Sequence, residues 1–300
     1  MTTTLPEPAR SRSAARILPL SAALMLAAAA VADETVVIDD PTEGSVAPYV
    51  PTVEEDVELM LEVAGVGPGD YVIDLGAGDG RIVIAAAKRG AFGHGVELEP
   101  ELVDVARRNA RAAGVAERTA FVQGDVFDAD VADASVVALY LFPEANIALR
   151  PKLLTELAPG TRIVSNSFDM GEWRPDVRDM SARSSGGILL WIVPADVDGE
   201  WTLEIDGGRE GARDGVPAER HVLRIGQTFQ EIDVALAPAD AGPPAAAAEA
   251  TLRGDRIAFR IEAGGRAYAF AGRVDGDAMS GFVHVREEGG TRLGRWRATR

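Results

Sequence analysis

The chain has 300 residues, of which 47% are hydrophobic and 26% are charged, a composition typical of soluble globular proteins and long enough for one large domain or two smaller ones. Its formal net charge of −17 repels phosphate backbones, which disfavours nucleic acid as a substrate and favours a small molecule or a basic protein. The lack of cysteine excludes disulfides, thiolate zinc sites and cysteine nucleophiles.

The first 32 residues have the pattern of a targeting segment. Three arginines lie within residues 10–16, a mostly apolar run follows at 17–31, and Ala30 and Ala32 have the small-x-small spacing that signal peptidases accept. A membrane-spanning helix needs about 20 apolar residues. We therefore interpret residues 1–32 as a signal peptide, with an uncleaved N-terminal anchor or an organelle presequence as alternatives. Export to the periplasm or the cell exterior is predicted; the anchor would give membrane association, and a non-functional signal would leave the protein in the cytoplasm.

Residues 52–195 alternate between helical and strand-like patterns, which is typical of βαβ units around a mostly parallel sheet. Strands are expected at residues 71–75, 93–98, 119–124, 135–141 and 161–168. Helices are expected at residues 81–89, 100–113 and 146–157. A further apolar run at residues 188–193 is predicted to be an antiparallel strand that closes the sheet. We therefore predict an α/β domain over residues 33–195.

Beyond this domain, helical periodicity gives way to period-two alternation, as in Trp201, Leu203 and Ile205. Glycine-rich turns separate the short strands, which predicts an all-β antiparallel barrel or sandwich domain over residues 196–300. The Ala/Pro-rich residues 237–248 are predicted to be a flexible loop within it.

A glycine-rich turn follows the first predicted strand. The chain reads Asp74 and then Gly76, Gly78 and Gly80 before a helix begins. Glycine suits such a turn because some positions need a positive φ and because a side chain would block a ligand that lies against the backbone. The spacing differs from the Gly-x-Gly-x-x-Gly of dinucleotide-binding folds, and no Lys-Ser/Thr pair follows as it does in a P-loop.

This motif resembles the first motif of class I S-adenosylmethionine (SAM)-dependent methyltransferases, whose fold is a Rossmann-like seven-stranded, mostly parallel sheet. The resemblance implies that the acid and the three glycines of the turn contact SAM. Glu97, 23 residues after the first acid, ends the second predicted strand and is placed to accept both ribose hydroxyls. Asp125 follows the third strand, and the resemblance implies that it receives the adenine amino group while Val126 packs on the ring. The alternative is that these acids are solvated loop residues.

Two further segments narrow the resemblance. Residues 48–52, before the first helix, and residues 78–88, after the first strand, are similar to the protein-lysine methyltransferases that modify ATP synthase c-subunit and adenine nucleotide translocase. The similarity runs from Tyr49 to Trp173 and implies that Tyr49 and Thr52 contact the cofactor. Thr52 also begins a Thr-x-x-Glu capping box that would open a helix.

The end of the fourth predicted strand carries aromatic residues. Tyr140 and Phe142 stand where methyltransferases of nucleic-acid amino groups often carry Asn/Asp-Pro-Pro-Tyr, which argues against that activity. With Tyr49 they are candidates for an aromatic lining that would keep a substrate lysine neutral, although Tyr140 equally fits a core aromatic. Asn166, at the end of the fifth strand, is a further lining candidate. No catalytic residue and no metal site is assigned, because the three histidines are scattered along the sequence.

These features predict a SAM-dependent methyltransferase that acts on a protein, as a protein-lysine N-methyltransferase, or on a small molecule. Because SAM is made in the cytoplasm, the targeting segment leaves a second hypothesis, an exported binding protein with a non-catalytic methyltransferase-like domain. The acids at three strand ends favour the enzyme. The β-rich domain begins with Gly199-x-Trp201, which slightly resembles the first strand of lipocalin-like barrels, and a plain core aromatic is the preferred interpretation.

Overall fold

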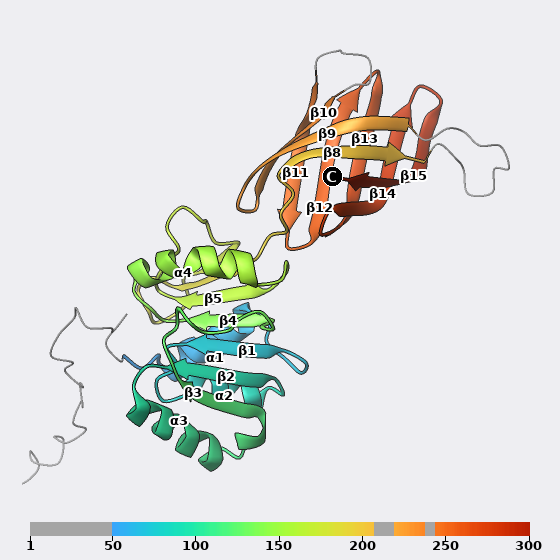
Figure 1. Ribbon diagram of the computed structural model, residues 1–300. Coiled ribbons are helices and arrows are strands. Elements are labelled where there is room, and N and C mark those ends of the chain that lie inside the picture. Colours follow the sequence, from blue (N-terminus) through green and yellow to red (C-terminus); the bar gives the residue numbers. More distant parts are fainter. Residues whose placement is uncertain (1–49, 207–218, 238–243) are drawn as a thin grey trace, which may run out of the picture. The chain divides into compact units, whose positions relative to one another are not determined.

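The computed structural model describes residues 50–206, 219–237 and 244–300. They form a seven-stranded sheet flanked by helices and a closed antiparallel barrel (Figure 1). The α/β prediction is confirmed, and of the two alternatives for the β-rich part the barrel is correct. The targeting segment lies outside the described residues, so it stays a prediction, as does the division between residues 195 and 196. Within the described residues, no helix is both long and apolar enough to cross a membrane.

The sheet has the strand order β3-β2-β1-β4-β5-β7-β6, and Figure 1 labels the part of this order from β3 to β5. Its strands are β1 (Tyr71–Leu75), β2 (Phe92–Glu97), β3 (Thr119–Gln123), β4 (Val136–Leu139), β5 (Arg162–Asn166), β6 (Val177–Asp179) and β7 (Ile188–Ile192). The helices are α1 (Glu54–Val63), α2 (Arg81–Lys88), α3 (Pro100–Ala112) and α4 (Pro143–Glu156), with a short 3-10 helix η1 (Ala116–Arg118). The first five strands are parallel. The strand order reverses between β1 and β4, and open α/β sheets bind ligands at the carboxyl ends of such strands.

The far edge of the sheet differs from the prediction. The strand at residues 188–193 is antiparallel as expected and forms β7, but β6 and not β7 closes the sheet. The three residues of β6 are exposed or half-buried, so they carry no apolar run that the sequence could reveal. Helix α4 begins at Pro143 instead of residue 146, because proline suits the first turn of a helix.

Helices pack on both faces of the sheet and bury alternating residues of its central strands. Val72 of β1 shares a hydrophobic cluster with Met60 and Leu61 of α1. Its neighbour Ile73 belongs to a different cluster, together with Leu149 of α4. This alternation follows from the two-residue repeat of a strand. Burial on both faces gives the strand ends a rigid support.

The barrel is built from eight antiparallel strands in chain order. They are β8 (Gly199–Ile205), β9 (Glu219–Thr228), β10 (Glu231–Ala237), β11 (Ala245–Arg253), β12 (Arg256–Ala263), β13 (Arg266–Asp275), β14 (Ala278–Glu287) and β15 (Gly290–Thr299). This is the up-and-down topology that lipocalins share. Trp201 is 1% exposed, which confirms the core interpretation. Phe259 and Phe270 stack at 4.5 Å, and the Trp296 ring meets both edge-on, so aromatic side chains fill the interior.

The Ala/Pro-rich segment is partly a strand. Residues 238–243 lie outside the described residues, but residues 245–248 belong to β11, so the prediction of a flexible loop at residues 237–248 is wrong for them. Alanine is depleted in strands in general. Here pairing with β10 and β12 determines the conformation, which no local pattern indicates.

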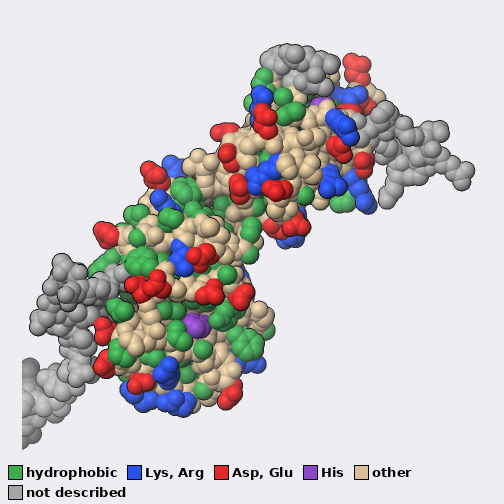
Figure 2. Space-filling view, viewed as in Figure 1, with side chains coloured by type: hydrophobic (Ala, Val, Ile, Leu, Met, Phe, Trp, Pro, Cys, Tyr) green, Lys and Arg blue, Asp and Glu red, His purple; other side chains and the backbone are tan. Residues whose placement is uncertain are grey.

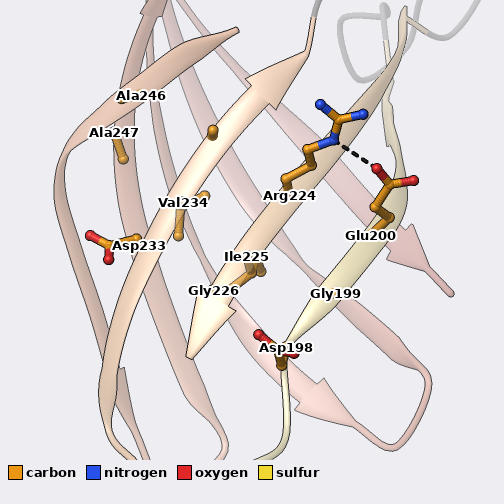
Figure 3. Close-up of a pocket in the computed structure, with 11 residues that line it drawn as sticks. Asp198, Gly199, Glu200, Arg224, Ile225, Gly226, Asp233, Val234, Ala246 and Ala247 are labelled. Carbon is orange, nitrogen blue, oxygen red and sulfur yellow. Dashed lines mark hydrogen bonds and ion pairs between the residues drawn. The ribbon is translucent and has the colours of Figure 1, made fainter. Parts of the chain in front are cut away.

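The barrel wall carries a hollow of about 490 Å³ (Figure 3). Gly199 and Gly226 line it, and a Cβ on either would meet open space. Beside them Arg224 forms an ion pair with Glu200 at 2.7 Å. Acidic and basic side chains are interspersed over the visible face of the protein (Figure 2).

Candidate cofactor and substrate site

The glycine-rich turn joins β1 to α2 at the carboxyl edge of the sheet. Gly76, Gly78 and Gly80 all have a positive φ, at 87°, 53° and 83°, which glycine adopts without strain. A Cβ on Gly80 would also lie 2.8 Å from the Phe121 ring. The positive φ values explain why glycine stands at these three positions, and close packing adds a second reason at Gly80. A turn without side chains also leaves its backbone accessible to a ligand.

Arg81 holds the residues before α1 against this turn. Its guanidinium donates to both carboxylate oxygens of Asp79, at 2.9 and 2.6 Å, and to the carbonyl oxygen of Thr52 at 2.5 Å. Thr52 is buried, and its contact with SAM stays a prediction. The capping-box prediction is wrong, because the N-cap of α1 is Val53 and no side chain caps the helix. Tyr49 lies outside the described residues.

Glu97 connects the end of β2 to the glycine turn. Its Oε2 accepts a hydrogen bond from the Gly78 amide at 2.7 Å, and its Oε1 accepts one from the Glu99 amide at 3.1 Å. Bonds to a charged acceptor are stronger than neutral ones, so this carboxylate is held in one orientation. The geometry fits an acid that accepts the ribose hydroxyls of a nucleoside lying over the turn.

Asp74 is only 2% exposed at the end of β1. Burial raises the pKa of its carboxyl well above the usual value, and the neighbouring carboxylates of Glu97 and Asp79 raise the pKa further. A ligand that brings positive charge would relieve this repulsion. SAM carries a sulfonium and an ammonium group, so the residues at this edge fit the cofactor.

Asp125 lies at the same carboxyl edge, directly after β3. Its side chain is exposed, and its Oδ1 accepts a hydrogen bond from the Phe127 amide at 2.9 Å, which fixes the turn. Val126 is 5% exposed and packs in the core beneath this turn. The sheet thus brings the acids that end β1, β2 and β3 to one edge, as expected. Their contacts with SAM stay predictions.

The aromatic residues after β4 form a cluster with one residue that the sequence reasoning missed. Phe168, after β5, stacks on Tyr140 at 6.2 Å and meets Phe142 edge-on at 5.9 Å. Phe142 is 42% exposed, while Asn166 is 1% exposed and accepts a hydrogen bond from Ser167. Asn166 therefore lies beneath the surface of the site. The signal for Phe168 was an aromatic residue at the very end of a predicted strand.

The next question is whether side chains of the described residues could hold a metal ion. Within the described residues, no three histidine, cysteine or acidic side chains lie close enough together to hold a metal ion. His94, in β2, is half-buried, and burial lowers the pKa of its imidazole.

The fold, the glycine turn and the acids at the strand ends define a class I SAM-dependent methyltransferase. The family model described as "ANTKMT methyltransferase domain" matches residues 74–177. A protein-lysine N-methyltransferase of Saccharolobus islandicus is 45% identical over 130 residues, which cover 43% of this chain and 81% of that protein. The chain belongs to this family of protein-lysine N-methyltransferases.

Two further relatives are also named as lysine methyltransferases. The ATP synthase c-subunit lysine N-methyltransferase of Xenopus laevis is 37% identical over 59% of this chain and 71% of its own length. The adenine nucleotide translocase lysine N-methyltransferase of Mus musculus is 37% identical over 57% of this chain and 69% of its own. A solved structure titled as an RNA methyltransferase from Salinibacter ruber, in complex with S-adenosyl-L-homocysteine, is 48% identical, covers 49% of this chain and 96% of that one, and has a TM-score of 0.47.

Proposed function

We propose that this protein transfers the methyl group of SAM to the side-chain amine of a lysine in a protein. The support is the group of relatives named as protein-lysine methyltransferases, at 37 to 45% identity. The aromatic cluster of Tyr140, Phe142 and Phe168 supports the same substrate, because it lies after β4 and β5 at the edge that carries the glycine turn.

SAM, when bound, supplies a methyl group that its sulfonium already makes electrophilic. The residues of this chain have to hold it and to orient the acceptor. Glu97 and the glycine turn bind and orient the nucleoside, and the buried Asp74 lies where the positive charge of the cofactor is favoured. Correct positioning of the amine can lower the barrier by several kcal/mol.

The acceptor amine has to arrive without its proton. An ammonium group loses hydration when it enters an apolar environment, which lowers its pKa and favours the neutral amine. Phe142 and Tyr140 provide apolar surface for this beside the end of β4.

The test uses a lysate of cells that lack the gene, incubated with purified protein and radiolabelled SAM. We expect label in protein, at lysine side chains when mass spectrometry locates it. ATP synthase c-subunit and adenine nucleotide translocase are the first candidates, because the names of relatives specify them. Label confined to RNA or to small molecules would overturn the proposal.

We also propose that residues 1–32 direct export, supported by their basic start, apolar run and small-residue cleavage pattern. N-terminal sequencing of the protein from fractionated native cells tests this. A protein that starts at Asp33 outside the cytoplasm is expected. A Met1 start in the soluble cytoplasmic fraction would overturn it. If the protein is exported, SAM binding measured by calorimetry distinguishes a retained cofactor site from a binding protein that no longer uses it.

A further inference from the structure

The turn after β5 holds an unusual backbone conformation. Ser167 has φ of 69° and is one of two non-glycine residues with a positive φ in the described part of the chain. Such a conformation is unfavourable for a residue with a side chain, and it persists only where surrounding contacts impose it. Strain of this kind is concentrated at functional sites, which makes this turn a candidate for a specific role.

Contacts from the loop before β7 impose the conformation. The Ser167 amide donates to the Gly187 carbonyl oxygen at 2.8 Å. Gly186 packs so closely that a Cβ on it would lie 2.0 Å from the Ser167 carbonyl oxygen. No other residue type fits at position 186 without moving the turn. The strained backbone is therefore built by two segments about twenty residues apart in sequence.

A second set of contacts holds the residue that follows. The Phe168 carbonyl oxygen accepts hydrogen bonds from the Ser165 hydroxyl at 2.7 Å and from the Asn146 side-chain amide at 3.2 Å. Asn146, in α4, is fully buried, and its Oδ1 has no partner among the described residues. Burying an unpaired oxygen costs free energy, and the hydrogen bonds that Nδ2 makes to this turn offset part of that cost.

These contacts place an aromatic surface next to the glycine turn. The Phe168 ring is half-buried and lies against Tyr140 and Phe142. The backbone between those two aromatics belongs to Leu141, whose side chain would lie 3.0 Å from a Cβ on Gly76. The cluster and the glycine turn are thus in contact through one residue.

We propose that Phe168 is a specificity-determining residue, whose ring forms with Tyr140 and Phe142 a wall that packs the aliphatic chain of the target lysine. The inference rests on the proposed function. An aromatic face suits this chain because it excludes water from the four methylene groups and from the neutral amine at their end. The strained turn and the buried amide of Asn146 position the ring.

The test measures binding and needs no turnover. The probe is an adenosine analogue whose 5′ nitrogen carries a four-carbon alkyl chain in place of the lysine side chain, and the reference compound carries a methyl group there. We expect the parent protein to bind the butyl compound about tenfold more tightly than the methyl compound, because part of the chain is buried. Phe168→Ala should lose most of this gain and keep its affinity for S-adenosylhomocysteine.

Phe92→Ala is the matched control, because Phe92 is an exposed phenylalanine at the opposite, amino end of β2. It should keep the full gain. Phe168→Leu keeps apolar volume and serves if the alanine variant does not fold; a reduction of at least about threefold in the gain is expected. An unchanged gain in either Phe168 variant, or no gain in the parent, overturns the inference. Lysine methylation by the parent protein in the lysate is measured separately. The role of Phe168 can therefore be refuted while the proposed function stands, and the reverse.

Discussion

Two carboxylates on inward-facing positions show how differently the two parts of the protein treat charge. In the sheet, Asp74 is buried near the carboxylate of Glu97, and the pKa of Asp74 is raised by burial and by that repulsion. In the barrel, Glu219 at the start of β9 accepts hydrogen bonds from Arg266 and Arg292, each at 3.0 Å. Two arginines balance Glu219 within the chain, whereas Asp74 is buried in an acidic environment.

We interpret Glu219 as a residue that stabilises the fold, and we propose that Asp74 serves the binding of a ligand. A paired carboxylate at a barrel end ties three strands together and needs no further partner. An acid that the fold buries beside other acids lowers stability until a cation arrives, and such strongly perturbed groups are concentrated at functional sites. Variants in each region test whether the two can be disturbed independently.

The largest effect is expected at the glycine turn. Gly78→Val should abolish SAM binding, because φ of 53° disfavours a branched residue and the side chain would occupy the path of the cofactor. The matched change in the barrel is Gly226→Val, where a Cβ meets open space, and it should leave SAM affinity within a few-fold of the parent. Calorimetric titration measures both. SAM binding by Gly78→Val within a few-fold of the parent would contradict the prediction.

Glu97→Ala should weaken SAM binding by about 1.5–3 kcal/mol, since a charge-assisted bond to the ribose is lost. Glu117→Ala removes an exposed carboxylate from η1 and serves as the control. Titration of both variants should separate them by at least about tenfold in Kd. Equal affinities would place Glu97 outside the cofactor site.

Asp74→Asn should stabilise the cofactor-free protein, by on the order of 1 kcal/mol at pH 8, and weaken SAM binding. The sign follows from the raised pKa. The folded protein holds this proton above the ordinary value of 3.8, so the stability of the parent falls as pH rises through the raised pKa. The advantage of the variant should therefore disappear toward pH 3.8. Denaturant unfolding at several pH values measures it, and an advantage that grows toward low pH would show the sign to be wrong.

The smallest effect is expected in the barrel. Glu219→Gln leaves two arginines without their shared carboxylate and should reduce the free energy of unfolding by about 1 kcal/mol, because all three side chains are partly exposed. SAM affinity should not change. If SAM affinity falls together with the free energy of unfolding, the barrel and the sheet are coupled, and the contrast between Glu219 and Asp74 is wrong.

The sequence by itself determined the parts of the site that depend on local spacing. Asp74 ends the first predicted strand just before the glycines, and Glu97 and Asp125 each end a further predicted strand. Since parallel strands end at one edge of a sheet, their proximity could be inferred without coordinates. The alternation that predicted the barrel strands is equally local, as Trp201 illustrates.

Only the tertiary structure decided the features that depend on contacts between distant segments. The edge strand β6 has no apolar pattern, and the alanines of β11 become a strand because β10 and β12 pair with them. The positive φ of Ser167 needs Gly186, and the placement of Phe168 needs the buried amide of Asn146. Each depends on packing between residues far apart in the chain, where neither composition nor periodicity carries a signal.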